Sequence, residues 1–332
     1  MSAAAGDTTI AAIPADVLQS RILNHLDGAT LASAACASTQ FLSLCNDDSL
    51  WKDICNATWP STADRRVLRA VAAFPAGHTS FFSDAFPVRR HLRFTARQTP
   101  LPSELISAVD VSFDGQIIFS KVLETETVSP WFLCTPFRLD LLDPKETVPT
   151  PLDLSSGDSA SIERAAERFK ITWILIDATN HRAVNVASES AVEVRRHWLT
   201  DDVQIRFATV VAGRSSGELL QCGVVMTFGG GGGGGGEARV KEISMQVEEM
   251  EGKIVTGAEG VAAVQAAMEG QKWKFDGVRE KDIYEEYTRM KAQFRERKQK
   301  REKGVDMVCI ATGVFVFVAL LLWMLSRSLS MP

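Results

Sequence analysis

Short helical periods alternate with capping residues between about Ile13 and Trp59. Pro14 suits a helix start, and Asp27-Gly28 suits its end. One apolar face lies between them, formed by Val17, Leu18, Ile22, Leu23 and Leu26. The side chains suited to cap three further helices are Thr30, Ser38 and Asp47. The pattern predicts a small helical unit over residues 13–60, which needs a neighbouring domain or a partner surface to cover its apolar positions.

The pattern changes to alternation beyond about residue 101. VDVSF, the turn Asp114-Gly115 and QIIFSKV together predict a tight β-hairpin. We expect further strands at Trp131 to Leu142, Phe169 to Asp177, Ala183 to Val186, Ala191 to His197, Val203 to Val211, Leu219 to Phe228 and Ala238 to Val247. So many short strands predict an antiparallel β-sandwich-like domain over 101–270. Residues 61–100, with helical character near Arg65 to Ala73, are expected to connect the two parts.

An uncharged apolar run of 19 residues extends from Met307 to Leu325. As a helix it would measure roughly 28 Å, about the thickness of a bilayer core. This length favours one transmembrane helix at 305–325 over a buried core helix. Several basic residues precede the run, whereas Arg327 is the only basic residue in the short tail 326–332. The positive-inside rule then predicts a tail-anchored, single-pass membrane protein with a cytosolic body. The short span favours the thinner endoplasmic reticulum bilayer.

The stem at 271–304 combines an apolar stripe with a basic surface. The stripe consists of Ile283, Tyr284, Tyr287, Met290 and Phe294. Its three- and four-residue spacing predicts an amphipathic helix from about Asp282. Lys291 to Lys303 holds seven basic and two acidic residues, a local charge of +5. The stripe could dock on the body or on a partner. For the basic surface two interpretations stay open: a solvated stalk near anionic headgroups, or a dedicated lipid-recognition site.

Charge and composition narrow the classes of partner. The formal net charge is −5, so removing the +5 of the stem leaves −10 for the rest of the 332 residues. An acidic body argues against nucleic acid as the main partner, because phosphate neutralisation needs clustered Lys and Arg. The first twenty residues hold no Lys or Arg and no long apolar run, so no secretory signal is expected. The segment 1–12 is expected to be disordered.

No catalytic or metal-binding constellation is evident in the sequence. The six cysteines lack CxxC pairs and matching His spacing, so we expect no metal site, no disulfide framework and no cofactor. His181 and His197 lack a nearby nucleophile. The glycine run Gly229 to Gly236 is followed by Glu237-Ala238 where a phosphate loop needs Lys and Ser or Thr, so it indicates a flexible insert. We expect a non-catalytic protein.

Three tryptophans of the middle region have two interpretations. Trp131, Trp173 and Trp198 could line a ligand groove, because aromatic rings stack on sugars and dominate binding hot spots. Packing in the core is the more common use of such residues.

The helical unit resembles an F-box. The order and spacing of its apolar and acidic positions match that motif from Ile13-Pro14 to Leu50-Trp51, with Ala37 and Phe41 in place of the usual Val and Trp. The segments VSPWFLCTPFRLDLLDP and HWLTDDVQIRFATVVAG are similar to a plant F-box subfamily that also ends in a membrane helix.

This resemblance implies docking onto a Skp family adaptor and, through it, a cullin-RING ubiquitin ligase. The adaptor-facing residues would come from Ile13, Pro14, Val17, Leu18, Ile22, Leu23, Leu26, Leu31 and Trp51, some of which must instead pack the module. The β domain would receive an unknown substrate protein by the same analogy. The alternative is a membrane-tethered β-sandwich binding or scaffold protein, lectin-like or protein-binding, whose helical module is only structural.

Overall fold

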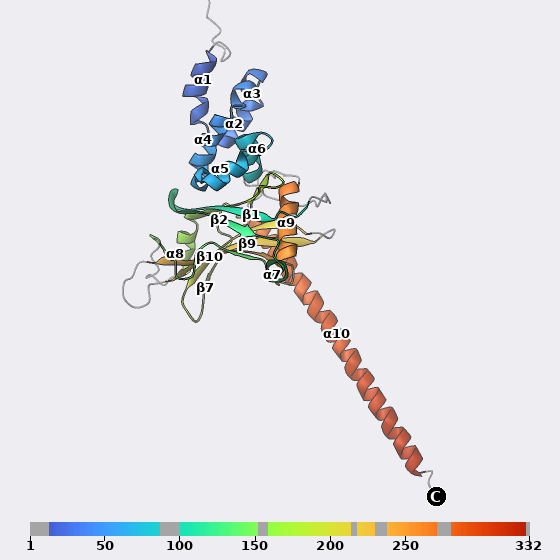
Figure 1. The fold of residues 1–332 in the computed structure, drawn as a ribbon. Coiled ribbons are helices and arrows are strands. Elements are labelled where there is room, and N and C mark those ends of the chain that lie inside the picture. Colours follow the sequence, from blue (N-terminus) through green and yellow to red (C-terminus); the bar gives the residue numbers. More distant parts are fainter. Residues whose placement is uncertain are drawn as a thin grey trace, which may run out of the picture.

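The molecule is layered, with helices above, two β-sheets in the middle and one long helix below (Figure 1). The computed structural model describes residues 13–86, 100–151, 159–213, 218–229, 238–270 and 280–329. The predictions for residues 1–12 and for most of the glycine run, 230–236, fall outside the described residues.

The helical module, residues 13–86, follows the capping signals of its sequence. It comprises α1 (Ala15–Arg21), η2 (Leu23–His25), α2 (Gly28–Ala35), α3 (Thr39–Cys45), α4 (Asp48–Thr58), η3 (Pro60–Ala63), α5 (Arg65–Val71) and α6 (Gly77–Ala85). Ser38 and Asp47 cap α3 and α4 as predicted. Thr30 was expected to cap the second helix, but that helix begins earlier. Asp27 is its cap, and its carboxylate accepts the Thr30 backbone N–H at 2.7 Å.

The middle domain, residues 100–270, consists of two antiparallel sheets, as predicted. The first has the order β2-β1-β5-β6, formed by β1 (Glu104–Phe113), β2 (Gln116–Glu126), β5 (Phe169–Asp177) and β6 (Arg182–Asn185). The second has the order β3-β10-β9-β8-β7, formed by β3 (Arg138–Asp140), β7 (Glu193–Arg196), β8 (Val203–Ala212), β9 (Leu219–Gly229) and β10 (Arg239–Glu248). The short β4 (Val148–Pro149) also pairs with β10.

Alternate residues of both sheets meet in one apolar core. Val109 and Val111 of β1 share it with Phe207 of β8 and Val224 of β9, and all four are inaccessible to solvent. Phe169 stands between the sheets, with its ring centre 4.7 Å from that of Phe113 and 5.0 Å from that of Phe228. This face-to-face packing of two inner surfaces defines a sandwich.

Three helices of the middle domain differ from the predicted pattern of strands. The expected strand at Trp131 to Leu142 contains α7 (Pro130–Cys134) followed by the short β3. Ser129 caps α7 and Pro130 occupies its first turn, a start signal that outweighs the β-like residues after it. The other two, α8 (Ser159–Ala166) and α9 (Gly257–Glu269), were not predicted.

The helical module packs on the outer face of the first sheet. The β1 residues that alternate with the sandwich core, Ile106 and Ala108, belong to the core of the helical module instead. Asp110 lies between the two parts and accepts hydrogen bonds from the Ser61 backbone N–H (2.9 Å), the Ser61 hydroxyl (2.6 Å) and the Ser120 hydroxyl (2.7 Å). Both faces of β1 are therefore covered.

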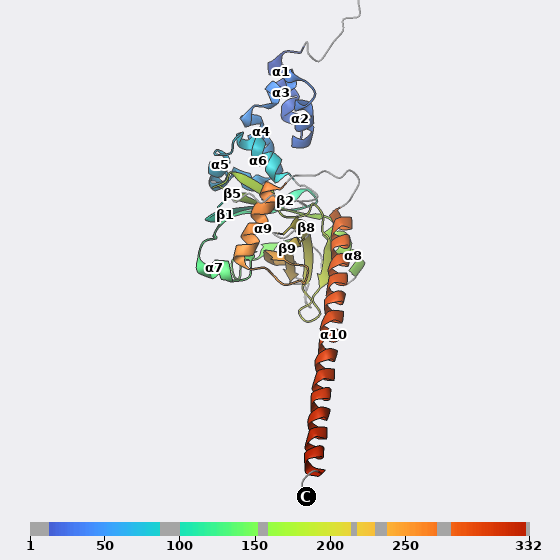
Figure 2. The ribbon, with the colours of Figure 1, turned by 90° about the vertical axis from the view of Figure 1, so that its right-hand side faces the viewer.

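One continuous helix, α10 (Glu280–Leu329), forms the stem and the apolar segment (Figure 2). Its first turns dock on the second sheet, where Tyr287 and Ile283 are buried against Val210 of β8. The apolar stripe of the stem therefore docks on the body in this part. Beyond Lys291, α10 is exposed as far as Leu325. This helix contains a window long and apolar enough to cross a membrane.

Candidate functional site

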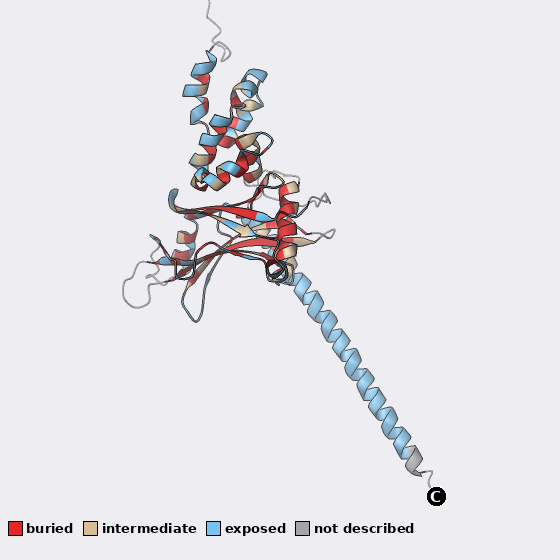
Figure 3. Cartoon of the chain, in the orientation of Figure 1, coloured by how far each residue is buried: buried red, intermediate tan, exposed pale blue. Residues whose placement is uncertain are grey.

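Exposed apolar side chains gather at the free end of the helical module. α1 and α3 lie at the end farthest from the β domain and are mostly exposed, whereas α4 to α6 bury residues against the sheet (Figure 3). Val17 of α1 is 40% exposed, Ile22 at its end is 41% exposed, and Leu42 of α3 is 53% exposed. Pro14 is exposed as well, and Ile13 and Leu26 are half-buried. Apart from Leu26, which also packs against the core of the module, these residues place apolar side chains at this end of the module, and we call them its apolar surface.

The other four predicted adaptor-facing residues are buried in the chain itself. Leu18 is 1% exposed, and Leu23, Leu31 and Trp51 belong to the core of the module. Trp51 donates its indole N–H to the Cys45 carbonyl at 2.7 Å and packs on Phe82 of α6 at 5.2 Å between ring centres. Their burial gives these four a packing role within the module.

The module depends on residues beyond 60 to hold its shape. A Cβ on Gly28 would lie 2.0 Å from the Phe82 ring, so this position of α2 has room only for glycine. Asp48 at the start of α4 accepts the His78 backbone N–H at 2.6 Å and lies 2.9 Å from its Nδ1. Residues 61–86 therefore pack together with residues 13–60.

Hydrogen bonds fix α1 relative to the rest of the module. The Gln19 side-chain amide donates to the Asp47 carboxylate at 2.5 Å, which joins α1 to the start of α4. The Ser49 hydroxyl and backbone N–H lower the pKa of the Asp47 carboxyl, so it stays charged as a cap. The apolar surface on α1 is thus held in place before any partner binds.

A shallow groove of about 460 Å³ lies beside this surface. It is lined by Leu26, Leu50 and Ile54 together with polar residues of η2 and α4, among them His25 and Asp53. Sequence reasoning did not find this groove or the exposure of Leu42. The exposure of Leu42 could have been predicted from the helix that Ser38 caps. In that helix Phe41, Leu44 and Cys45 turn toward the core, whereas Leu42 is exposed.

The three predicted groove tryptophans do not form one site. Trp173 is fully buried in the sandwich core, so of its two interpretations core packing holds and a place in a ligand groove does not. Trp131 on α7 is 76% exposed and Trp198, between β7 and β8, is 87% exposed. They belong to separate elements of the β domain.

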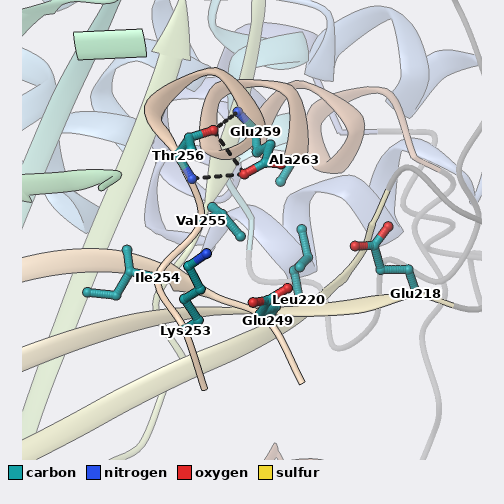
Figure 4. A pocket seen from close by; sticks show the side chains of 9 residues that line it. All are labelled: Glu218, Leu220, Glu249, Lys253, Ile254, Val255, Thr256, Glu259 and Ala263. Carbon is teal, nitrogen blue, oxygen red and sulfur yellow. Dashed lines mark hydrogen bonds between the residues drawn. The ribbon is translucent and has the colours of Figure 1, made fainter. Parts of the chain in front are cut away.

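A cavity of about 330 Å³ lies at the start of α9 in the β domain (Figure 4). Lys253 and Glu249 line it, but its other central polar groups already bond to each other. Glu259 accepts the Thr256 backbone N–H at 2.9 Å, and Thr256 in turn accepts the Glu259 backbone N–H at 3.4 Å. This capping box stabilises α9. Among the described residues no group of three His, Cys, Asp or Glu side chains could hold a metal ion.

Comparison with known proteins settles the family. Residues 10–57 match the F-box-like family model. F-box protein At2g27310 of Arabidopsis thaliana is 41% identical over 327 residues, with 96% of each chain covered. The chain belongs to the plant F-box proteins. F-box protein At3g44326 of the same plant is 37% identical, and the match covers 94% of the present chain and 89% of At3g44326. Probable F-box protein At2g36090, also of Arabidopsis thaliana, is 34% identical over 96% of the present chain and 94% of its own length.

No solved structure matches this F-box protein. At the level of the family, F-box proteins link substrates to Skp-type adaptors in cullin-based ubiquitin ligases and are generally non-catalytic subunits. The predicted membership is therefore confirmed, and the relatives match over the β domain and α10 as well as the F-box.

Proposed function

We propose that this protein is a membrane-anchored substrate-recognition subunit of a Skp–cullin–F-box ubiquitin ligase. Its F-box would bind the adaptor through the exposed residues of α1 and α3. Its β domain would receive the protein to be ubiquitinated, and the apolar part of α10 would hold both at a membrane, with the body in the cytosol.

The observation that carries the adaptor role is the apolar surface at the free end of the module. Val17, Ile22 and Leu42 are each 40% exposed or more, while the residues behind them are packed. Exposed apolar side chains grouped on a small, rigid module mark a protein–protein contact. Leu18, Leu23 and Leu31 would support this surface from within.

The β domain supports a separate recognition role. It has its own core and the helical module covers only one of its sheets, so much of its surface stays open. The membrane role is supported by the hydropathy and exposure of the window of α10 that could span a bilayer, none of which is buried in the protein. An exposed apolar helix of this length is stable in lipid and aggregation-prone in water.

The adaptor role is tested by a charge at one exposed position. Ile22→Asp places a carboxylate in the proposed contact, where its desolvation should cost about 2 kcal/mol, roughly thirtyfold in Kd. The measurement is binding of a purified Skp family adaptor to the detergent-solubilised full chain.

The matched control is Ile117→Asp. Ile117 is 45% exposed, close to the 41% of Ile22, but it lies on β2 outside the helical module. This variant should bind the adaptor like the wild type. A folded wild-type protein that does not bind the adaptor, or equal binding by the two variants, contradicts the proposal.

A further inference from the structure

The connection between β7 and β8 carries two exposed apolar side chains at its tip. Trp198 is 87% exposed and Leu199 is 70% exposed. Tight turns usually hold Gly, Pro, Asn, Asp or Ser, because these residues fit the backbone and stay solvated. A Trp-Leu pair gains nothing for the fold in this position, which indicates that something outside the chain contacts it.

The tip is a well-ordered turn that presents both side chains outward. The His197 backbone N–H donates to the Asp202 carbonyl at 2.8 Å, and the Asp201 N–H donates back to the His197 carbonyl at 2.9 Å. The Thr200 N–H donates to the His197 ring nitrogen at 3.2 Å. The stacked His197 ring also supports Trp198 from one side.

Charges around the tip are paired. Arg196 lies 3.1 Å from Asp201, and Lys241 lies 2.8 Å from Asp202. The tip therefore exposes one aromatic and one aliphatic side chain, and the charged residues beside them are paired with opposite charges. Tryptophan in such a setting is typical of membrane–water interfaces, where the ring lies at the level of the headgroups.

The tip lies on the side of the body from which α10 leaves. In Figure 1 the strand pair that begins at β7 hangs below the β domain, away from the helical module, and α10 also descends below it, slanting away from this hairpin. Figure 2, turned about the vertical axis, keeps the helical module above and α10 below. A bilayer that holds the lower part of α10 would face the second sheet and this hairpin.

The stem of α10 is short enough to bring the body close to the lipid. Lys298 still contacts the β domain through Glu251, at 2.6 Å. Met307, where the apolar run begins, follows about nine residues later, roughly 14 Å along a helix. Headgroups extend about 5–8 Å beyond the hydrocarbon core, and transmembrane helices tilt by about 20° on average. A tilt of α10 that lowers the hairpin side of the body would bring the tip toward the headgroup layer.

We propose that Trp198 and Leu199 form a second membrane contact, inserting into the interface of the bilayer that holds α10. This inference rests on the proposed membrane anchoring. With two contacts on one body, the second sheet is held against the lipid and the F-box is held away from it. Because the charges at the tip are balanced, the contact needs no anionic lipid.

The test places a fluorescent label at single cysteines of the full chain in phosphatidylcholine vesicles. The exposed cysteines Cys36, Cys134 and Cys309 are first replaced by Ser. NBD is then attached at Leu199→Cys, at Val316→Cys within the apolar run, or at Ile117→Cys on the first sheet. Each label is exposed to lipids that carry a nitroxide quencher on the headgroup or deep in the acyl chain.

The expected result is that the label at 199 is quenched by the headgroup nitroxide, the label at 316 by the acyl-chain nitroxide, and the label at 117 by neither. Adding Trp198→Ser to the chain labelled at 199 should reduce its quenching to the level at 117. Quenching at 316 without quenching at 199 overturns the membrane contact and leaves the anchor intact, which would favour a protein partner for the tip. Absence of quenching at 316 overturns both the anchor and this contact.

Discussion

The buried carboxylate of Asp110 helps to join the F-box module to the β domain. Asp110 is 4% exposed, and burial raises the pKa of its carboxyl above the ordinary range even though Ser61 and Ser120 donate hydrogen bonds to it. The Ser61 N–H has no solvent to replace this acceptor. Removing this acceptor would leave its buried hydrogen-bond donors without a partner, which lowers the free energy of unfolding by their desolvation penalty.

Asp110→Ala should therefore destabilise the protein by about 2–4 kcal/mol, because it leaves a backbone N–H and two hydroxyls without their acceptor. Asp110→Asn, which keeps one acceptor oxygen, should cost less. The measurement is the free energy of unfolding in urea. Asp140→Ala removes a carboxylate that is 51% exposed and paired with Arg138, and should change stability by under about 1 kcal/mol. An equal effect of the two alanine variants would show that Asp110 does not hold the parts together.

At the residue scale, the sequence predicts which positions are apolar but not which of them are buried. The apolar positions of the F-box were identified from their spacing, yet spacing does not separate Ile22, which is exposed, from Leu23, which is buried. That distinction arises from η2, a short 3-10 turn that redirects the chain after α1. Trp173 and Trp198 have the same side chain in similar strand-like sequence, and tertiary packing alone buries the first and exposes the second.

Among the elements, α10 is docked partly through a charged cluster around Glu248. Glu248 of β10 lies 3.1 Å from Arg206 and 3.0 Å from Lys291, and its side chain is only 12% exposed. Burial would raise the pKa of Glu248, but the charges of Arg206 and Lys291 and their hydrogen bonds hold it below its usual range. The Tyr287 ring packs beside this cluster, with the Lys291 ammonium 5.8 Å from its centre.

The lowered pKa gives the cluster a defined pH dependence. A carboxyl whose folded pKa is depressed stabilises the protein fully above its unfolded pKa of about 4.3, and this stabilisation is lost as the pH falls through the folded value. Glu248→Gln should lower the free energy of unfolding at pH 7 by about 2 kcal/mol and flatten its acid dependence.

The comparison for this variant is Glu251→Gln, which also removes a partner of α10 but at a side chain that is 40% exposed. Its effect should stay below about 1 kcal/mol. Thermal or urea unfolding between pH 3 and 7, in about half-unit steps, measures both variants against the wild type. If Glu248→Gln retains the full acid dependence of the wild type, the cluster is not its source.

Element-level prediction succeeded where one period dominates. The strand at Phe169–Asp177 begins with alternation and continues as an apolar run, and the helix at Arg65–Val71 starts at the capping residue Asp64. α9 was missed because it is buried on nearly all sides, and a run of Gly, Ala and Val buried all round shows no amphipathic period. Gly260 lies against the Phe137 ring at a distance that leaves no room for a Cβ, a contact that no local pattern reveals.

On the scale of the whole molecule, the β-sandwich lies between the F-box module and the docked part of α10. The F-box covers the outer face of the first sheet, and α10 docks on the outer face of the second. The sequence predicted the parts but could not place them, because the shared residues Ile106 and Ala108 belong to a β1 that is buried on both faces. The sandwich thus separates the proposed adaptor surface from the proposed membrane side.

The anchor is tested by ending the chain before Val305. This truncation keeps Ile283, Tyr287 and Lys291, so the docked part of α10 and the fold of the body should persist. The full chain should stay with cellular membranes through high-salt and alkaline carbonate washes, because a transmembrane helix is held by its apolar length. The truncated chain should be released by these washes, since the basic stem and the Trp198 tip provide only peripheral contacts.

Ile22→Asp in the full chain separates the two functions in the same experiment. It should lose the adaptor and remain on the membrane, whereas the truncated chain should leave the membrane and still bind the adaptor. Membrane retention of the truncated chain after both washes would contradict the anchor. Because α10 is docked on the second sheet through Tyr287 and Lys291, the helix would fix the orientation of the body as well as its location. Proteins at the same membrane surface would then meet the β domain at a raised effective concentration, with the F-box directed away from the lipid.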